Sequence, residues 1–136
     1  MKKALLVAAL VVLALGAGWQ TLRFSRQHLD AKVARFNADA EDLLLGLQQY
    51  KEFTGSYPTG HNLDIARALS GQTDKKVFIL AVRKSVRNAK GEIVDPWGTP
   101  LQFYVSGNSV LIRSAGPNKV WEDSSVATSD DLFRSN

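Results

Sequence analysis

The chain has 136 residues, of which 45% are hydrophobic and 22% charged, and this length and composition are typical of one small folded domain with an anchoring segment. It has no cysteine, which excludes a disulfide framework and a thiolate metal site. The formal net charge is +4, and Lys2 and Lys3 supply half of it. Because this balance is only mildly basic, we expect no nucleic-acid partner.

Residues 1–22 form an apolar segment behind two lysines, with no charge between Lys3 and Arg23. As a helix, residues 4–22 would be about 28 Å long at ~1.5 Å per residue, which nearly matches a hydrocarbon core of ~30 Å. The segment is therefore predicted to be a membrane anchor. A cleaved secretory signal is the alternative, because a basic start, an apolar centre and small residues fit it as well. Both interpretations export the rest of the chain.

Residues 23–54 are predicted to continue this helix as an amphipathic stalk. Apolar residues recur there at spacings that alternate between four and three, which is the pattern of a heptad seam. The seam consists of Leu29, Val33, Phe36, Ala40, Leu43, Leu47 and Tyr50. No proline precedes Pro58, so one helix is expected from Ala4 to about Phe53.

Residues 55–136 are predicted to form a globular head that packs with the stalk as one domain. Gly55 and Pro58 end the long helix. The stretch "NLDIARALSG" predicts a short helix with Asn62 or Asp64 near its N-cap. The run "KVFILAV" is apolar and rich in β-branched residues, which fits either a buried strand or an ordered packing segment.

Two strands are predicted further along, at 101–105 and 110–114, and a loop centred on Ser106-Gly107-Asn108 joins them as a hairpin. The apolar seam of the stalk must be buried against another element, and the sheet is the only adequate one. We therefore expect an α+β fold in which the long helix packs on a small antiparallel sheet.

The stretch "DPWGTPLQFY" places a tryptophan in a turn just before the hairpin. Pro96 has a fixed φ and forces Asp95 to be extended, whereas Gly98 permits a positive φ. Trp97 is then held at a corner where its ring can fill the edge between helix and sheet. We expect a structural role for it rather than stacking on a ligand.

Several of these stretches in combination resemble the type II secretion pseudopilins, of the major-pseudopilin type. They are "YKEFTGSYPT" at the end of the stalk, "DPWGTPLQFY" before the hairpin, and "IRSAGPN" followed by "DD". The resemblance covers about residues 36–131. It implies a pilin-like fold and a single-pass protein of the bacterial inner membrane with its C-terminal domain in the periplasm. It also implies self-association, and assembly with other pseudopilins and platform proteins, into a periplasmic filament for protein secretion.

The same resemblance implies a calcium ion near the C-terminus. Calcium takes roughly 6–8 oxygen ligands, and the loop "GPNKVWEDSSVATSDDL" offers carboxylates from Asp130 and Asp131, with Asp123 and the Asn118 side chain as further candidates. The acidic pair Glu122-Asp123 departs from the family pattern, which leaves the individual ligands open. The alternative is a polar tail with surface acids.

The N-terminal segment also departs from the family pattern. No acidic residue lies between Lys3 and Arg23, and no Gly-Phe pair precedes that segment, although pilin-like precursors carry both features for cleavage and assembly. Two alternatives follow: an uncleaved pilin-like subunit, or a pilin-like domain used outside a filament.

No arrangement of residues indicates an enzyme. The two histidines, His28 on the stalk and His61 in a loop, lie in no nucleophile or metal-ligand motif. The serines lack the sharp turn that carries a hydrolase nucleophile. We therefore expect a structural subunit. The alternative is a membrane-anchored or exported pilin-like binding or envelope module that is not part of a filament.

Overall fold

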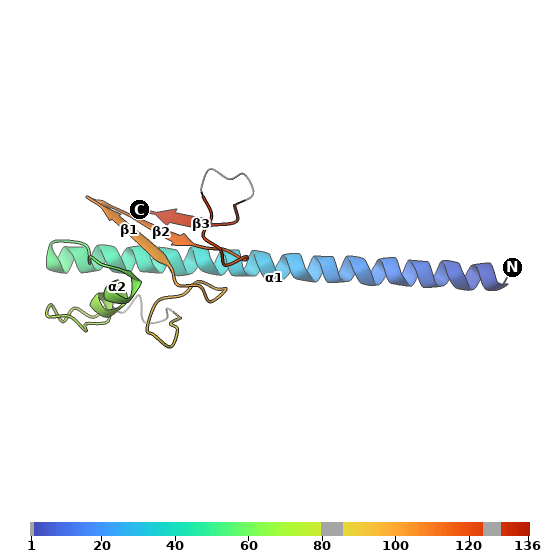
Figure 1. Ribbon diagram of the computed structural model, residues 1–136, viewed down its shortest axis with the longest axis horizontal. Coiled ribbons are helices and arrows are strands. Elements are labelled where there is room, and N and C mark those ends of the chain that lie inside the picture. The colour runs from blue at the N-terminus through green and yellow to red at the C-terminus, as the bar shows by residue number, and fades with distance from the viewer. Residues whose placement is uncertain (1, 80–85, 124–128) are drawn as a thin grey trace. The chain divides into compact units, whose positions relative to one another are not determined.

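The computed structural model describes residues 2–79, 86–123 and 129–136, without the side chains of residues 2–22 and 24. The chain divides into two compact units, Met1–Val33 and Ala34–Asn136. The elements are α1 (Lys2–Thr54), α2 (Asn62–Leu69), β1 (Gln102–Ser106), β2 (Ser109–Ser114) and β3 (Leu132–Ser135) (Figure 1). An α+β fold with a long helix is therefore confirmed.

Helix α1 ends where the sequence predicts. The hydroxyl of Thr54 donates to the carbonyl of Tyr50 at 2.8 Å, and the N–H of Gly55 donates to the carbonyl of Lys51 at 2.7 Å. Gly55 has φ +87°, the left-handed conformation that glycine adopts most easily at a helix end. Among the described residues we find no helix with both the length and the apolar content that a membrane crossing requires. The side chains of the predicted anchor, residues 1–22, lie outside the described set.

One face of α1 supplies much of the core of the second unit. The buried seam residues are Phe36, Ala40, Leu43, Leu47 and Tyr50. Leu29 is exposed and Val33 is half-buried, and both belong to the first unit. The part of the predicted seam that packs within the head therefore begins at Phe36.

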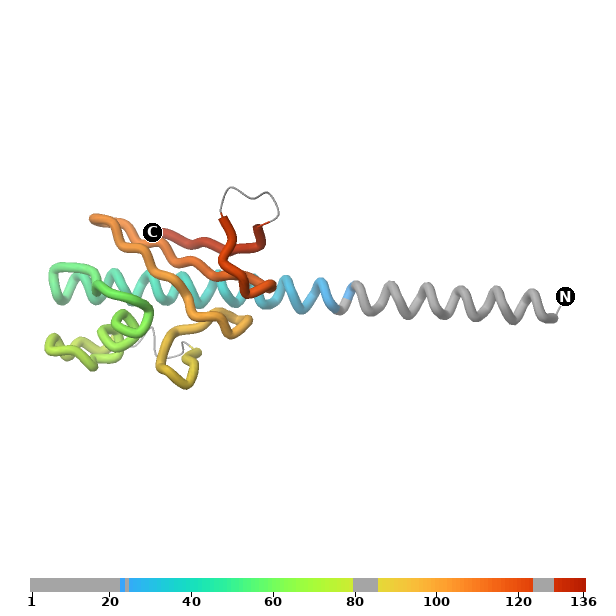
Figure 2. The backbone as a smooth tube through the Cα atoms, in the orientation of Figure 1, coloured from blue at the N-terminus to red at the C-terminus, as the bar shows by residue number. Residues whose placement is uncertain are grey.

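The sheet has three strands in the order β1-β2-β3, and both pairs are antiparallel. The predicted hairpin is confirmed to within one residue at each strand end. Strand β2 is central, and its residues Val110 and Ile112 are buried in the same cluster as the α1 seam, so the sheet packs on the helix (Figure 1). Strand β3 was not predicted. It brings residues 132–135 back beside β2, as the chain path in Figure 2 shows.

Helix α2 forms where the sequence predicts it, with His61 at the N-cap. The Asp64 carboxylate accepts the backbone N–H of His61 at 3.0 Å. The described part of the "KVFILAV" run forms only an isolated bridge, between Ser70 and Phe78. Ile79 is buried in the core, and residues 80–82 of this run lie outside the described residues.

Candidate functional site

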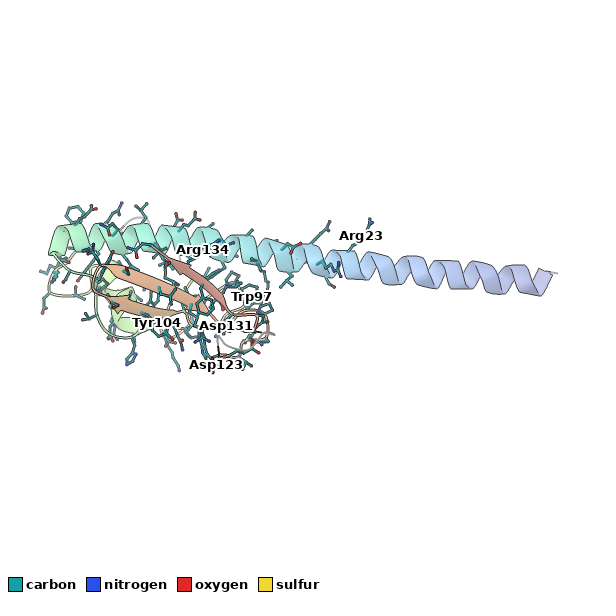
Figure 3. The ribbon with its side chains drawn as sticks, turned by 90° about the horizontal axis from the view of Figure 1, so that it is seen from above. Arg23, Trp97, Tyr104, Asp123, Asp131 and Arg134 are labelled. Carbon is teal, nitrogen blue, oxygen red and sulfur yellow. The ribbon has the colours of Figure 1, made fainter. Side chains whose placement is uncertain are left out.

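The turn that contains Trp97 is built around the buried carboxylate of Asp95. One oxygen of Asp95 accepts the backbone N–H groups of Trp97 and Thr99, each at 2.9 Å. The other accepts the hydroxyl of Ser114, at the end of β2, at 2.6 Å. Gly98 has φ +89°, as the predicted turn requires, and Trp97 packs against the core while half-buried (Figure 3). Asp95 thus joins the turn to the central strand.

Asn62, at the start of α2, also joins separate segments of the chain through its side chain. Its amide nitrogen donates to the carbonyls of Ile93 and Leu101 at 2.8 and 2.7 Å, and its oxygen accepts the N–H of Ile93 at 2.7 Å. A helix-capping role was predicted for Asn62 or Asp64, and the carboxylate of Asp64 takes it. Pro58, the other predicted structural residue, is buried next to Tyr57. The hydrogen bonds of Asn62 thus join the start of α2 to the segments around Ile93 and Leu101.

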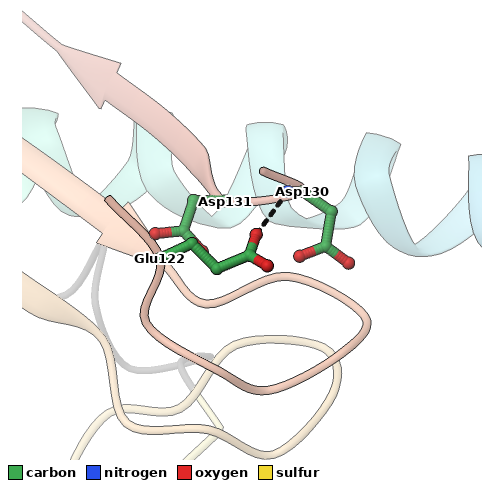
Figure 4. A group of neighbouring side chains, drawn as sticks. All are labelled: Glu122, Asp130 and Asp131. Atoms are coloured by element: carbon green, nitrogen blue, oxygen red, sulfur yellow. Dashed lines mark hydrogen bonds between the residues drawn. The ribbon is translucent and has the colours of Figure 1, made fainter. Parts of the chain in front are cut away.

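Three carboxylates gather where β2 ends and β3 begins. Glu122 lies in the loop after β2, and Asp130 and Asp131 immediately precede β3. One oxygen of each residue lies within 4.8 Å of the others. Glu122 also accepts the backbone N–H of Asp130 at 3.0 Å, the dashed line in Figure 4. The pairing of β3 with β2 places Asp130 and Asp131 next to the end of β2.

The cluster leaves negatively charged oxygens buried. The Asp131 side chain is 0% exposed, and its Oδ2 accepts the Nε–H of Arg113 at 2.6 Å. The Oδ1 atoms of Asp130 and Asp131 are buried and have no hydrogen-bond partner among the described residues. A buried carboxylate oxygen without a partner is energetically costly, and among the described residues these two atoms are in that position.

Arg113 forms an ion pair with Asp131 of the cluster. Its guanidinium also donates to the backbone carbonyl of Glu122, and it lies 5.3 Å from the ring centre of Trp121 and 5.4 Å from that of Phe133. Burial lowers the pKa of Arg113, but the interactions with the Asp131 carboxylate and with Tyr104 raise it by more. The group therefore stays cationic.

Of the four predicted calcium ligands, two belong to this cluster of carboxylates and two do not. The structure brings Asp130 and Asp131 together, whereas Asp123 is exposed and outside the group of three. Asn118 donates its backbone N–H to Asp130 at 3.2 Å, while its side-chain oxygen accepts the N–H of Val120 at 2.7 Å. The third carboxylate is that of Glu122. As calcium ligands, all of these residues remain predictions.

Gly116 makes room for the backbone before β3. It has φ +66°, and a Cβ atom built on it would lie 2.2 Å from the carbonyl oxygen of Asp130. Any side chain at this position would push residue 130 away, so the close approach requires glycine. The donor set of the cluster suits calcium, which prefers carboxylate and carbonyl oxygens.

A second feature is a cavity of about 470 Å³ beside β1, within the usual size range of ligand pockets. Its walls include aromatic and polar side chains from several segments: His61, Glu92, Gln102, Phe103, Tyr104 and Trp121. Of the two histidines, His61 lies here and His28 is exposed on α1.

No protein-family model, no curated protein and no solved structure matches this chain.

Proposed function

We propose that the chain is a structural subunit of a periplasmic pseudopilus in type II protein secretion, with a pilin-like fold and no enzymatic activity. The observation that carries the proposal is helix α1, Lys2–Thr54, whose seam is buried in the head only from Phe36 onwards. The remaining part of the helix, with the apolar sequence of residues 4–22, then serves the membrane and neighbouring subunits.

In this proposal residues 1–22 are a single-pass anchor in the bacterial inner membrane, and residues 55–136 lie in the periplasm. Helices in lipid associate through close packing, which small residues permit. Gly16, Ala17 and Gly18 provide such residues. The partners are further copies of the chain, other pseudopilins and the platform proteins of the inner membrane.

Calcium fits the same proposal. Glu122, Asp130 and Asp131 would hold the ion, and the buried Oδ1 atoms of the two aspartates are the observation that supports it. When bound, the ion supplies positive charge that links the loop after β2 to the start of β3.

The test is secretion in the bacterium that encodes the chain. Deleting the gene should stop the export of folded cargo, and the full chain should restore it. A matched variant that carries residues 23–136 behind a cleavable signal should deliver a folded head to the periplasm without restoring secretion, because it lacks the anchor helix. Full restoration by that variant, or normal secretion in the deletion strain, would contradict the proposal.

The second candidate is a pilin-like binding or envelope module that is not part of a filament. The cavity beside β1, with Tyr104 and Trp121 in its walls, favours this alternative, because aromatic walls with a few polar groups are typical of ligand sites. It predicts that secretion is independent of the chain. It also predicts that Tyr104→Ala removes the chain's cellular role while the head stays folded, since Tyr104 is exposed.

A further inference from the structure

Arg113 reaches the acidic cluster from the central strand of the sheet. Its side chain is 16% exposed, and it pairs with Asp131 and with the carbonyl of Glu122. The rings of Trp121 and Phe133 flank the guanidinium, and contacts between a cation and aromatic rings favour that position. The arginine is thus held in place by groups other than the carboxylates alone.

Among the described residues, the three carboxylates of the cluster outnumber the one guanidinium that pairs with them. Three ionised carboxylates and one guanidinium leave a net charge of −2 among Glu122, Asp130, Asp131 and Arg113. Arg113 occupies Oδ2 of Asp131, while the Oδ1 atoms of both aspartates are buried without a partner among the described residues. One divalent cation would neutralise the group.

We propose that Arg113 is a positioning residue for the candidate metal site, where it neutralises one carboxylate permanently and leaves the charge of one divalent cation to be filled. This inference rests on the calcium part of the proposed function. Arg113 keeps the loop next to β3 when the ion is absent, because it holds Asp131 and Glu122 at the same time. It also limits how much stability the ion adds, since part of the repulsion is already removed.

Removing Arg113 should therefore destabilise the chain much more without the ion than with it. Without an ion, Asp131 would be a buried carboxylate with no counter-charge, which is strongly destabilising. With calcium bound, the ion supplies that counter-charge. The stabilisation by calcium should then be larger in the variant than in the wild type, by the ordinary linkage between binding and folding.

The experiment measures the melting temperature of the full chain in detergent, in EDTA and in calcium chloride. We expect Arg113→Gln to melt on the order of 5–10 °C lower than wild type in EDTA, and to recover most of this loss in calcium. Arg113→Lys keeps the charge and should show a calcium shift close to that of the wild type. Arg35→Gln removes an exposed arginine that pairs with Asp39 at 3.5 Å, and it should change neither value.

The site itself is tested in the same series. Asp130→Asn should abolish the calcium shift, and Asp123→Asn, at an exposed position outside the cluster, should leave it intact. A wild type without any calcium shift would reject the metal site, and with it the role of Arg113, but would leave the secretion proposal to its own test.

A wild type that responds to calcium, with an Arg113→Gln loss of equal size in both media, would show that Arg113 is only a packing residue. An Arg113→Gln chain that folds in neither medium would also overturn the inference, because calcium would then fail to replace the lost charge. A chain that folds only in calcium would support it. A calcium shift for Arg113→Lys as large as for Arg113→Gln would reject the electrostatic explanation.

Discussion

Asp95 shows how one buried carboxylate can fix a turn. It is 4% exposed, and it satisfies the backbone N–H groups of Trp97 and Thr99 together with the hydroxyl of Ser114. The hydroxyl oxygen of Ser114 in turn accepts the N–H of Gly116 at 3.1 Å. The motif therefore connects, through a few hydrogen bonds, to the glycine that lies against Asp130.

We expect Asp95→Ala to destabilise the chain by on the order of 3–5 kcal/mol, because several buried donors lose their acceptor at once. Asp95→Asn keeps the oxygen that serves the two backbone N–H groups, so its cost should be about 1 kcal/mol. Urea unfolding of the detergent-solubilised chain, followed by circular dichroism, measures both. Equal effects of the two substitutions would contradict this account, because asparagine keeps the shape of the side chain and the oxygen that accepts the two backbone N–H groups.

At this scale the sequence predicts the backbone better than the side-chain partners. Pro96 and Gly98 predict a turn, because proline restricts φ and glycine permits a positive φ. The acceptor role of Asp95 depends on Ser114, 19 residues away, and that of Asn62 on Ile93, 31 residues away. No local pattern reveals partners that only the folded chain brings together.

Among the elements, α1 has one buried face and one exposed face. Leu47 is 0% exposed, whereas Leu45, less than one turn away, is 53% exposed. The heptad seam predicted from the sequence contains the first and omits the second. The burial of these two leucines therefore gives a matched pair for testing how the helix packs on the sheet.

Leu47→Ala should lower the free energy of unfolding by about 2–5 kcal/mol, the usual cost of truncating a buried leucine. Leu45→Ala should change it by less than about 0.5 kcal/mol, since an exposed side chain loses little on truncation. The same urea titration measures both variants. A similar loss for the two would mean that this face of α1 does not pack on the sheet as described.

Periodicity and turn residues predict α1, α2 and the hairpin, but they do not predict β3. Its sequence, "LFRS", is short, follows a polar loop and has no alternation long enough to mark a strand. It is a strand because β2 provides the pairing edge. For the same reason the sequence cannot decide between Glu122 and Asp123 as the third carboxylate, since these neighbours lie in an irregular loop whose path β3 determines.

On the scale of the whole molecule, the two units differ in where their apolar residues can be buried. The unit Ala34–Asn136 buries its own core, from the seam of α1 to β2. The unit Met1–Val33 carries the apolar sequence of residues 4–22, whereas the core of the head, among the described residues, begins at Phe36. In the proposed subunit, that apolar segment lies in the inner membrane and packs against the same segment of neighbouring copies.

Cross-linking of introduced cysteines in living cells tests this central claim most directly, because the chain has no cysteine of its own. One cysteine is fixed at Ala14, and a second is moved through residues 5–11. A control pair replaces Thr59 and Lys90, which are exposed on the head.

Filament assembly predicts that some of the pairs in the apolar segment give a ladder of dimers, trimers and larger species under oxidation, and that the control pair gives none. A membrane-bound, folded chain that stays monomeric for every pair in the apolar segment would contradict the proposed subunit role.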